Sequence, residues 1–99
     1  MIVAFSLAPA VTDEDGGVAE AVAEAIRVVR ESGLPHETNA MFTNVEGEWD
    51  EVMAVVKQCV AVLTARSPRV SLVLKADIRP GRTGQLQAKV ERIEDLLQP

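Results

Sequence analysis

Hydrophobic and polar residues alternate along the opening stretch of the chain, from Ile2 to Ala8. Val3, Phe5 and Leu7 share one face of this stretch, and smaller residues occupy the other face. A period of two residues is typical of a β-strand with one buried face. Pro9 ends the predicted strand, because proline cannot donate a hydrogen bond to a central ladder.

Two later segments repeat apolar residues at helical spacing. The first begins at Val18, after an acidic turn over Thr12–Gly17, and it ends where Gly33 and Pro35 interrupt it. The second begins within residues 46–51, where the helix dipole favours the acidic side chains. Its broad apolar stripe consists of Val52, Val55, Val56, Cys59, Val60 and Leu63.

The remaining segments predict three further elements. His36–Glu46 is expected to form a short hairpin, with its turn at Asn39 and Ala40. Arg69–Arg79 shows the clearest alternation, and Pro80–Gly81 ends it. A final helix is marked by apolar residues at spacings of four, three and four: Leu86, Val90, Ile93 and Leu97.

The predicted order is therefore β-α-β-β-α-β-α, in one domain over residues 1–99. Two β-α-β units with right-handed crossovers interleave into a single sheet. We predict an α+β fold of the ferredoxin-like, split β-α-β type. Its four-stranded antiparallel sheet has the strand order 4-1-3-2, with helices on one face. The third helix must then pack at the sheet edge or between subunits.

Composition narrows the possible partners. The net charge is −5, and no basic cluster exists of the kind that nucleic-acid backbones require. No segment approaches the ~20 apolar residues of a membrane span. The 99 residues include only one Trp and two Phe, so the core is aliphatic and small. Such a core is marginal alone, which favours a homo-oligomer.

The chemistry-bearing residues do not indicate an enzyme. Cys59 is the only cysteine, which suits a reducing cytoplasm and permits no internal disulfide. It lies on the apolar stripe and is expected to be a small buried hydrophobe. His36 has no partner residue with which to hold a metal. The chain lacks a paired nucleophile and base and any cofactor fingerprint.

Two features near the strand ends are weaker candidates. Trp49, at the head of the second helix, is expected to be a packing anchor rather than a platform for a ligand. Gly81 and Gly84 lie near Arg79 and Arg82, where a phosphate could bind, although no P-loop pattern is present.

Topology brings a set of polar residues together. The third and fourth strands run parallel on either side of the first, so their C-terminal ends lie at the same end of the sheet. The face without helices then carries Phe42, Asn44, Glu46, Lys75, Asp77 and Arg79. Ala4 and Ser6 form a floor of small residues between them, and a second subunit could enclose this face as a cavity. A solvated ladder of charges on the fourth strand is the commoner outcome of such a pattern.

Two motifs add a family resemblance. Residues Thr43–Asp50 read Thr-x-Val-Glu-Gly-x-Trp-Asp, and Lys75–Arg79 reads Lys-x-Asp-x-Arg. In combination they resemble the YkoF-like thiamine-binding family of small ferredoxin-like proteins, and the similarity extends over nearly all of the chain. The resemblance implies subunits assembled by sheet faces and edges into dimers and tetramers. It also implies binding of thiamine or its hydroxymethylpyrimidine moiety, without catalysis.

The resemblance also implies site residues. Glu46, Asp77 and Arg79 match positions that topology already brings together, whereas Asn39 and Thr43 enter through the motif match. Alternation turns Thr43 toward the helices, so a contact on the uncovered face would need a bulge. The complete predicted ligand-binding set is Asn39, Phe42, Thr43, Glu46, Lys75, Asp77 and Arg79.

The leading hypothesis is a cytoplasmic homo-oligomer, a dimer or tetramer, that binds a thiamine-like molecule at an inter-subunit site on the sheet face. Glu46 and Asp77 would accept hydrogen bonds from the ligand, and Lys75 and Arg79 would orient the acids. Asn39 would contribute an amide. Thiamine or its hydroxymethylpyrimidine moiety is the small molecule implied, and neither a metal nor another cofactor is expected. The alternative is a structural or regulatory interaction module that uses the sheet face only for assembly.

Overall fold

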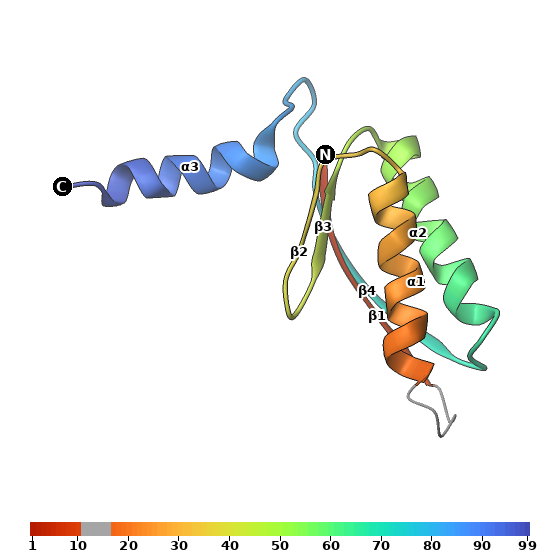
Figure 1. Ribbon diagram of the computed structural model, residues 1–99. Coiled ribbons are helices and arrows are strands. Elements are labelled where there is room, and N and C mark those ends of the chain that lie inside the picture. The colour runs from red at the N-terminus through yellow and green to blue at the C-terminus, as the bar shows by residue number, and fades with distance from the viewer. Residues whose placement is uncertain (11–16) are drawn as a thin grey trace.

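The computed structural model describes residues 1–10 and 17–99, and its elements follow the predicted order (Figure 1). The bounds are β1 (Ile2–Pro9), α1 (Gly17–Glu31), β2 (His36–Thr38), β3 (Thr43–Glu46), α2 (Trp49–Thr64), β4 (Val70–Asp77) and α3 (Gln85–Leu97). Residues 11–16, which contain most of the predicted acidic turn, lie outside the described residues. Gly17, the last residue of that predicted turn, already belongs to α1.

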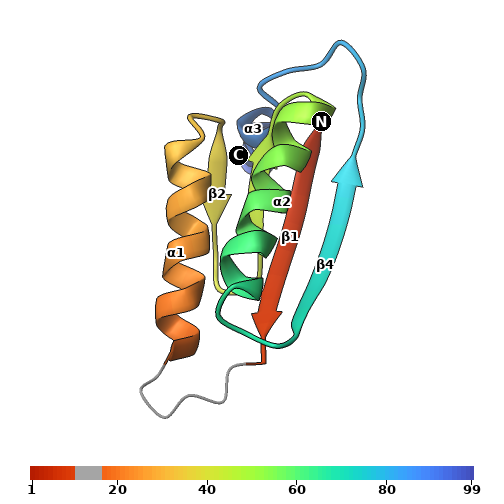
Figure 2. The same ribbon diagram turned by 90° about the vertical axis from the view of Figure 1, so that its right-hand side faces the viewer.

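The sheet has the strand order β2-β3-β1-β4, and each neighbouring pair is antiparallel. This order is the predicted 4-1-3-2 read from the other edge, and it places β1 between β3 and β4. Since β3 and β4 both run antiparallel to β1, they run parallel to each other. Helices α1 and α2 lie side by side over one face (Figure 2). The predicted ferredoxin-like α+β fold is confirmed.

Alternation along β1 decides which face is buried. Val3 and Phe5 are 0% and 3% exposed, because they point toward α1 and α2. Val45 of β3 pairs with Val3 and extends the same buried layer. The helices contribute the rest of this core, which consists of Ala21, Ala25, Val29, Val52, Val55, Val56, Cys59 and Leu63. The apolar stripe predicted for α2 is therefore its core-facing stripe, with Val60 only partly buried.

The hairpin between β2 and β3 departs from the prediction at one residue. Phe42 was expected on the outer face of the third strand, but β3 begins one residue later, at Thr43. The side-chain oxygen of Asn39 accepts hydrogen bonds from the backbone N–H groups of Met41 and Phe42, both at 2.9 Å. These bonds hold Phe42 in the turn, as an Asx-type turn does. Because Phe42 lies in the turn and not in β3, the alternation of side chains along β3 does not determine where the Phe42 ring points.

Helix α3 extends away from the rest of the molecule, on the side of the sheet opposite α1 and α2 (Figure 1). None of its residues is buried, and Leu96 and Leu97 are 77% and 73% exposed. An isolated helix of fewer than ~12–15 residues is marginal in water, so a 13-residue helix needs support from contacts. Those contacts lie near its N-terminus.

Glu46 supports the start of α3. Its carboxylate is buried, at 5% exposure for the residue, and accepts hydrogen bonds from the backbone N–H groups of Gln85 (2.8 Å) and Leu86 (3.2 Å). The residue at the N-cap position is Gly84, which has no side chain to cap the helix. A carboxylate at this end also interacts favourably with the helix dipole. Glu46 therefore caps a helix that begins 39 residues later in the chain.

A second polar contact joins α3 to β4. The ammonium of Lys89 donates a hydrogen bond of 2.5 Å to the carboxylate of Asp77. This bond lowers the pKa of the Asp77 carboxyl, and the nearby positive charges of Arg79 and Lys75 contribute in the same direction. Both groups are well exposed, so the pair orients α3 more than it stabilises the fold.

Cys59 lies between α1 and α2. It is 0% exposed, and its Sγ donates to the carbonyl oxygen of Ala25 at 3.3 Å. Burial raises the pKa of the thiol to about 11. The expectation that Cys59 is a small buried hydrophobe is confirmed.

Replacing Glu46 with alanine should loosen the first turn of α3, because two backbone N–H groups lose their acceptor. We expect faster amide hydrogen exchange at Gln85 and Leu86, equivalent to about 0.5–2 kcal/mol, the usual range for a lost cap. Glu37→Ala is the control, since Glu37 is exposed on β2 and makes no contact with these amides in the described residues. Unchanged exchange in Glu46→Ala would contradict this capping role.

High pH should destabilise the protein through Cys59. Below pH about 8.5 the thiol is protonated in both the folded and unfolded states, so it has no effect. Above that pH the unfolded thiol ionises while the folded one does not, until the folded pKa of about 11 is reached. The free energy of unfolding should therefore fall by at most about 1.4 kcal/mol per pH unit in this window. Urea unfolding at pH 8 and pH 10.5 should show a steeper loss in the wild type than in Cys59→Ala, and equal slopes would count against it.

Candidate functional site

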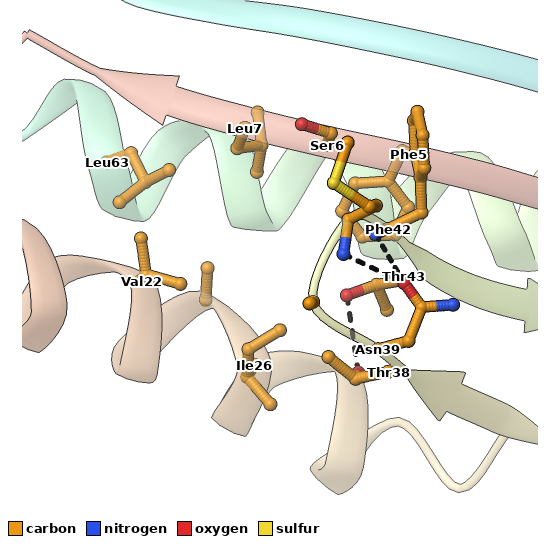
Figure 3. Close-up of a pocket in the computed structure, with 13 residues that line it drawn as sticks. Phe5, Ser6, Leu7, Val22, Ile26, Thr38, Asn39, Phe42, Thr43 and Leu63 are labelled. Carbon is orange, nitrogen blue, oxygen red and sulfur yellow. Dashed lines mark hydrogen bonds between the residues drawn. The ribbon is translucent and has the colours of Figure 1, made fainter.

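A pocket of about 230 Å³ opens at the turn between β2 and β3 (Figure 3). It lies on the helix side of the sheet, where α1 and the end of α2 face the turn. We call it the turn pocket. Its lining residues are Phe5, Ser6, Leu7, Val22, Ala25, Ile26, Thr38, Asn39, Ala40, Met41, Phe42, Thr43 and Leu63. Three of the seven sequence-predicted site residues are among them.

Thr43 reaches the turn pocket because it faces the helices. It pairs with Phe5 in the sheet and is 6% exposed, on the same face as the core. Its hydroxyl lies 3.3 Å from the hydroxyl of Thr38 on the neighbouring strand, and either can donate. No bulge is needed for this placement, since the pocket is on the buried side of the sheet and not on its outer face.

Asn39 forms the rim of the same pocket. Its side-chain oxygen is occupied by the backbone N–H groups of the turn, and its own N–H donates to the carbonyl of Phe42 at 3.0 Å. The side-chain NH₂ group makes no hydrogen bond within the described part of the chain. It is therefore a donor that a bound molecule can use, while the oxygen keeps the turn rigid.

The character of the turn pocket is apolar and uncharged. None of its 13 lining residues carries a charge. Val22 and Ile26 point into it from α1, and Leu63 from α2 (Figure 3). Phe5 and Phe42 add aromatic surface, and hydroxyl and amide groups gather at one side. Apolar walls with a few polar groups suit a flat, neutral ring with hydrogen-bonding edges.

The acidic pair of the prediction lies on the other face of the sheet. Ile2 pairs with Glu46 on one side and with Asp77 on the other, so the two acids flank one residue of β1. Two strand spacings separate their Cα atoms, which is about 10 Å. Glu46, Asp77 and Arg79 also line one narrow crevice, together with Arg82 and Gln85 of the α3 approach. The two strand ends therefore do converge on the uncovered face.

Both acids are already engaged in this structure. Glu46 caps α3, and Asp77 pairs with Lys89, as described above. Lys75 lies two residues before Asp77 on the same face of β4, opposite Ala4. Thr43 and Glu46 are three positions apart on β3, which is about 10 Å along the strand. Within one subunit, the predicted set is thus divided: Asn39, Phe42 and Thr43 line the turn pocket, whereas Glu46, Lys75 and Asp77 lie on the outer face. Arg79 was predicted to lie on the fourth strand, but β4 ends at Asp77, so Arg79 belongs to the loop beyond it and borders the same crevice as Glu46 and Asp77.

Several residues of the turn pocket were not predicted as site residues. Phe5, Val22, Ile26 and Leu63 belong to the periodic apolar pattern, and the sequence gives them the same signature as any core residue. No pattern in the sequence distinguishes Thr38 from other polar strand residues. The identity of a pocket wall depends on where the core is incompletely filled, which periodicity does not encode.

The described residues show two absences. Among them, no group of three or more His, Cys, Asp or Glu side chains could hold a metal ion. No helix of the described segments is long and apolar enough to span a membrane.

Comparison with other proteins gives matches over most of the chain. Residues 3–94 match the family described as thiamine-binding protein. The UPF0045 protein Mb1933 of Mycobacterium bovis is 54% identical over 98 residues, which cover 98% of this chain and 94% of that protein. A UPF0045 protein of Synechocystis, sll0230, is 38% identical over 82 residues, covering 82% of this chain and 68% of that protein.

Solved structures show the same fold. The hypothetical protein MJ1052 of Methanocaldococcus jannaschii superposes with a TM-score of 0.82 at 29% identity, covering 95% of each chain. A Thermotoga maritima protein, provisionally described as one of thiamine biosynthesis or salvage, has a TM-score of 0.74 at 32% identity. That match covers 92% of this chain and 97% of the other. This chain belongs to the thiamine-binding protein family.

Proposed function

We propose that this chain binds thiamine or its hydroxymethylpyrimidine moiety without chemical turnover, and that the aminopyrimidine ring occupies the turn pocket. One observation carries the proposal. Asn39, Phe42 and Thr43, which lie close together in the chain, line one uncharged pocket in a member of a thiamine-binding family. Membership of the family supports a thiamine-like ligand, and the uncharged lining of the pocket supports the aminopyrimidine ring as the part that enters it.

The polar groups of the pocket match the edge of an aminopyrimidine. Such a ring carries an amino group that donates and ring nitrogens that accept. The NH₂ group of Asn39 can donate to a ring nitrogen, and the Thr43 hydroxyl can accept from the amino group. The ring of Phe42 supplies a flat surface beside them. Each predicted contact therefore has a complementary atom on the ligand.

The thiazolium half of thiamine has a different requirement. It carries a fixed positive charge, and no lining residue of the turn pocket is a carboxylate. The cation would therefore remain at the mouth, near the exposed side chain of Met41, in contact with water or with a second subunit. Thiamine and hydroxymethylpyrimidine should accordingly bind with similar affinity.

The predicted residues on the outer side of the sheet would belong to a different ligand site. Glu46, Lys75, Asp77 and Arg79 would meet the ligand only where a second subunit closes the outer face, as an inter-subunit site. In this arrangement the two acids already hold α3, so a ligand there would have to compete with Gln85, Leu86 and Lys89. The turn pocket needs no such rearrangement. We therefore assign the ring to the turn pocket and keep the sheet face as the alternative location.

Assembly is the second candidate function, and one observation favours it. The final helix exposes the apolar residues Val90, Ile93 and Leu97 at 54%, 59% and 73%. Val73 is 57% exposed on the outer face of the sheet. Val90, Ile93 and Leu97 recur at helical spacing and so share one face of α3, and an exposed apolar stripe of this kind usually marks an interaction site. We propose a homo-oligomer, a dimer or tetramer in a cytoplasmic setting, in which a second copy covers these residues.

Isothermal titration tests the ligand. Thiamine and hydroxymethylpyrimidine should each bind the wild type with measurable heat. Thr43→Val and Asn39→Ala should each weaken binding about 5- to 30-fold, the range expected for a lost hydrogen bond of about 1–2 kcal/mol. Glu37→Gln, which changes an exposed residue of β2, should leave the affinity unchanged. Absence of heat with both ligands would exclude the proposal.

The same titration separates the two locations. Asp77→Asn should leave the affinity unchanged if the ring occupies the turn pocket, and should weaken it if the ring lies on the sheet face. The pure interaction module makes a third forecast. Asp77→Ala would then alter the oligomer mass, while no thiamine-like molecule would shift the melting temperature.

Light scattering after size-exclusion chromatography tests the assembly. Ile93→Asp places a charge on the exposed apolar stripe of α3 and should lower the measured mass to that of a monomer of 10.7 kDa. Ala88→Asp introduces the same charge on another face of the helix and should leave the mass unchanged. A wild type that is already monomeric would contradict the assembly.

A further inference from the structure

A second hollow, of about 260 Å³, lies beside Trp49 and the loop that follows β4. Trp49 opens α2 and is 55% exposed, so it is not the packing anchor that its position in the sequence suggested. Ile78, Arg79 and Arg82 border the same hollow, and Met1 closes one side. We call it the Trp49 pocket. It shares no lining residue with the turn pocket.

Within residues 1–10 and 17–99, the two guanidinium groups that border this pocket have no carboxylate partner. The ion pairs within the described residues join Arg66 to Glu20 and Glu24, and Lys89 to Asp77. Neither Arg79 nor Arg82 takes part in them. Asp77 and Glu46 border a crevice with these arginines, but Asp77 already binds Lys89 at 2.5 Å, and Glu46 accepts from the backbone of α3. The two arginines therefore keep their donors for a ligand.

The loop brings the two arginines together. The backbone N–H of Arg82 donates to the carbonyl of Arg79 at 3.1 Å, which closes a four-residue turn. Such a turn holds its first and last Cα atoms within about 7 Å. Gly81 has φ +76°, a conformation that favours glycine, and so fixes the turn at this point. Two long side chains that start from Cα atoms this close together can direct both guanidinium groups to the oxygens of one phosphate.

Charge in the pocket favours anions over cations. Glu48 is the one acid among its lining residues, against the two arginines. The pocket therefore carries a local charge of about +1, although the whole chain carries −5. Thiamine, with its fixed positive charge, is disfavoured here, whereas a phosphate dianion is favoured. The exposed indole adds a flat aromatic surface next to this charge.

We propose that the Trp49 pocket binds the phosphate monoester of a flat aromatic ring. The ring lies against the indole of Trp49, and Arg79 and Arg82 hold the phosphate by charge-assisted hydrogen bonds. The site is separate from the turn pocket and does not depend on the ligand proposed there. Its two parts select for a ligand that carries both a ring and an anion.

Fluorescence measures this site directly, because Trp49 is the only tryptophan of the chain. Phenyl phosphate serves as the probe, with inorganic phosphate and uncharged phenol as partial probes. Phenyl phosphate should change the emission of Trp49 saturably, with an affinity at least about tenfold higher than either partial probe. Thiamine should leave the emission unchanged. Failure of thiamine to bind the turn pocket would therefore not affect this result.

Variants complete the test. Arg82→Gln should weaken phenyl phosphate about tenfold, and Arg79→Gln combined with it should abolish saturable binding. Arg69→Gln removes an exposed arginine near the opposite end of β4 and should have no effect. Trp49→Leu, followed by calorimetry, should weaken phenyl phosphate without weakening inorganic phosphate. Emission that does not respond to phenyl phosphate, or that responds equally in the Arg79→Gln/Arg82→Gln variant, would overturn the proposal.

Discussion

The central strand imposes the constraint on which the rest of this structure depends. β1 pairs with β3 on one side and β4 on the other, and Ile2 faces both Glu46 and Asp77. A slip of one residue in either pairing would turn Val3 and Phe5 out of the core, because side chains alternate between the faces. Burial of these two residues therefore fixes the register of the outer face as well. The acids converge because the apolar residues beneath them are buried.

This register also divides the polar residues of the chain between two environments. On the helix side, an incompletely filled part of the core leaves the turn pocket, where hydroxyl and amide groups carry no charge. On the outer side, charged residues surround the start of α3, and Glu46 is buried by serving as its cap. A buried carboxylate is costly unless it is hydrogen-bonded, and two backbone N–H groups meet that need. One face thus keeps an uncharged pocket, while the other positions a helix.

The fold could be predicted from the sequence because its determinants are local. Alternation in β1 and β4, helical stripes in α1 and α2, and the punctuation at Gly33 and Pro35 each depend on neighbouring residues. The convergence of Glu46 and Asp77 followed from topology alone. The partner of Glu46 did not, because a cap from a residue 39 positions away leaves no periodic signal. The prediction for Phe42 was wrong for a similar reason. Its backbone N–H donates to the side-chain oxygen of Asn39, and this hydrogen bond keeps Phe42 in the turn.

The predicted site is split for a simple geometric reason. Sequence motifs group residues by their positions in the chain, so Asn39, Thr43 and Glu46 read as one cluster. The strand separates them, since Thr43 and Glu46 differ by an odd number of positions and therefore face opposite sides. An uncharged pocket on one face and a charged edge on the other favour ligands of different charge. A cationic ring system is tolerated only where no arginine faces it, and an aromatic phosphate only where arginines do. The two proposed ligands therefore call for different pockets, since no arginine lines the turn pocket and two arginines line the Trp49 pocket.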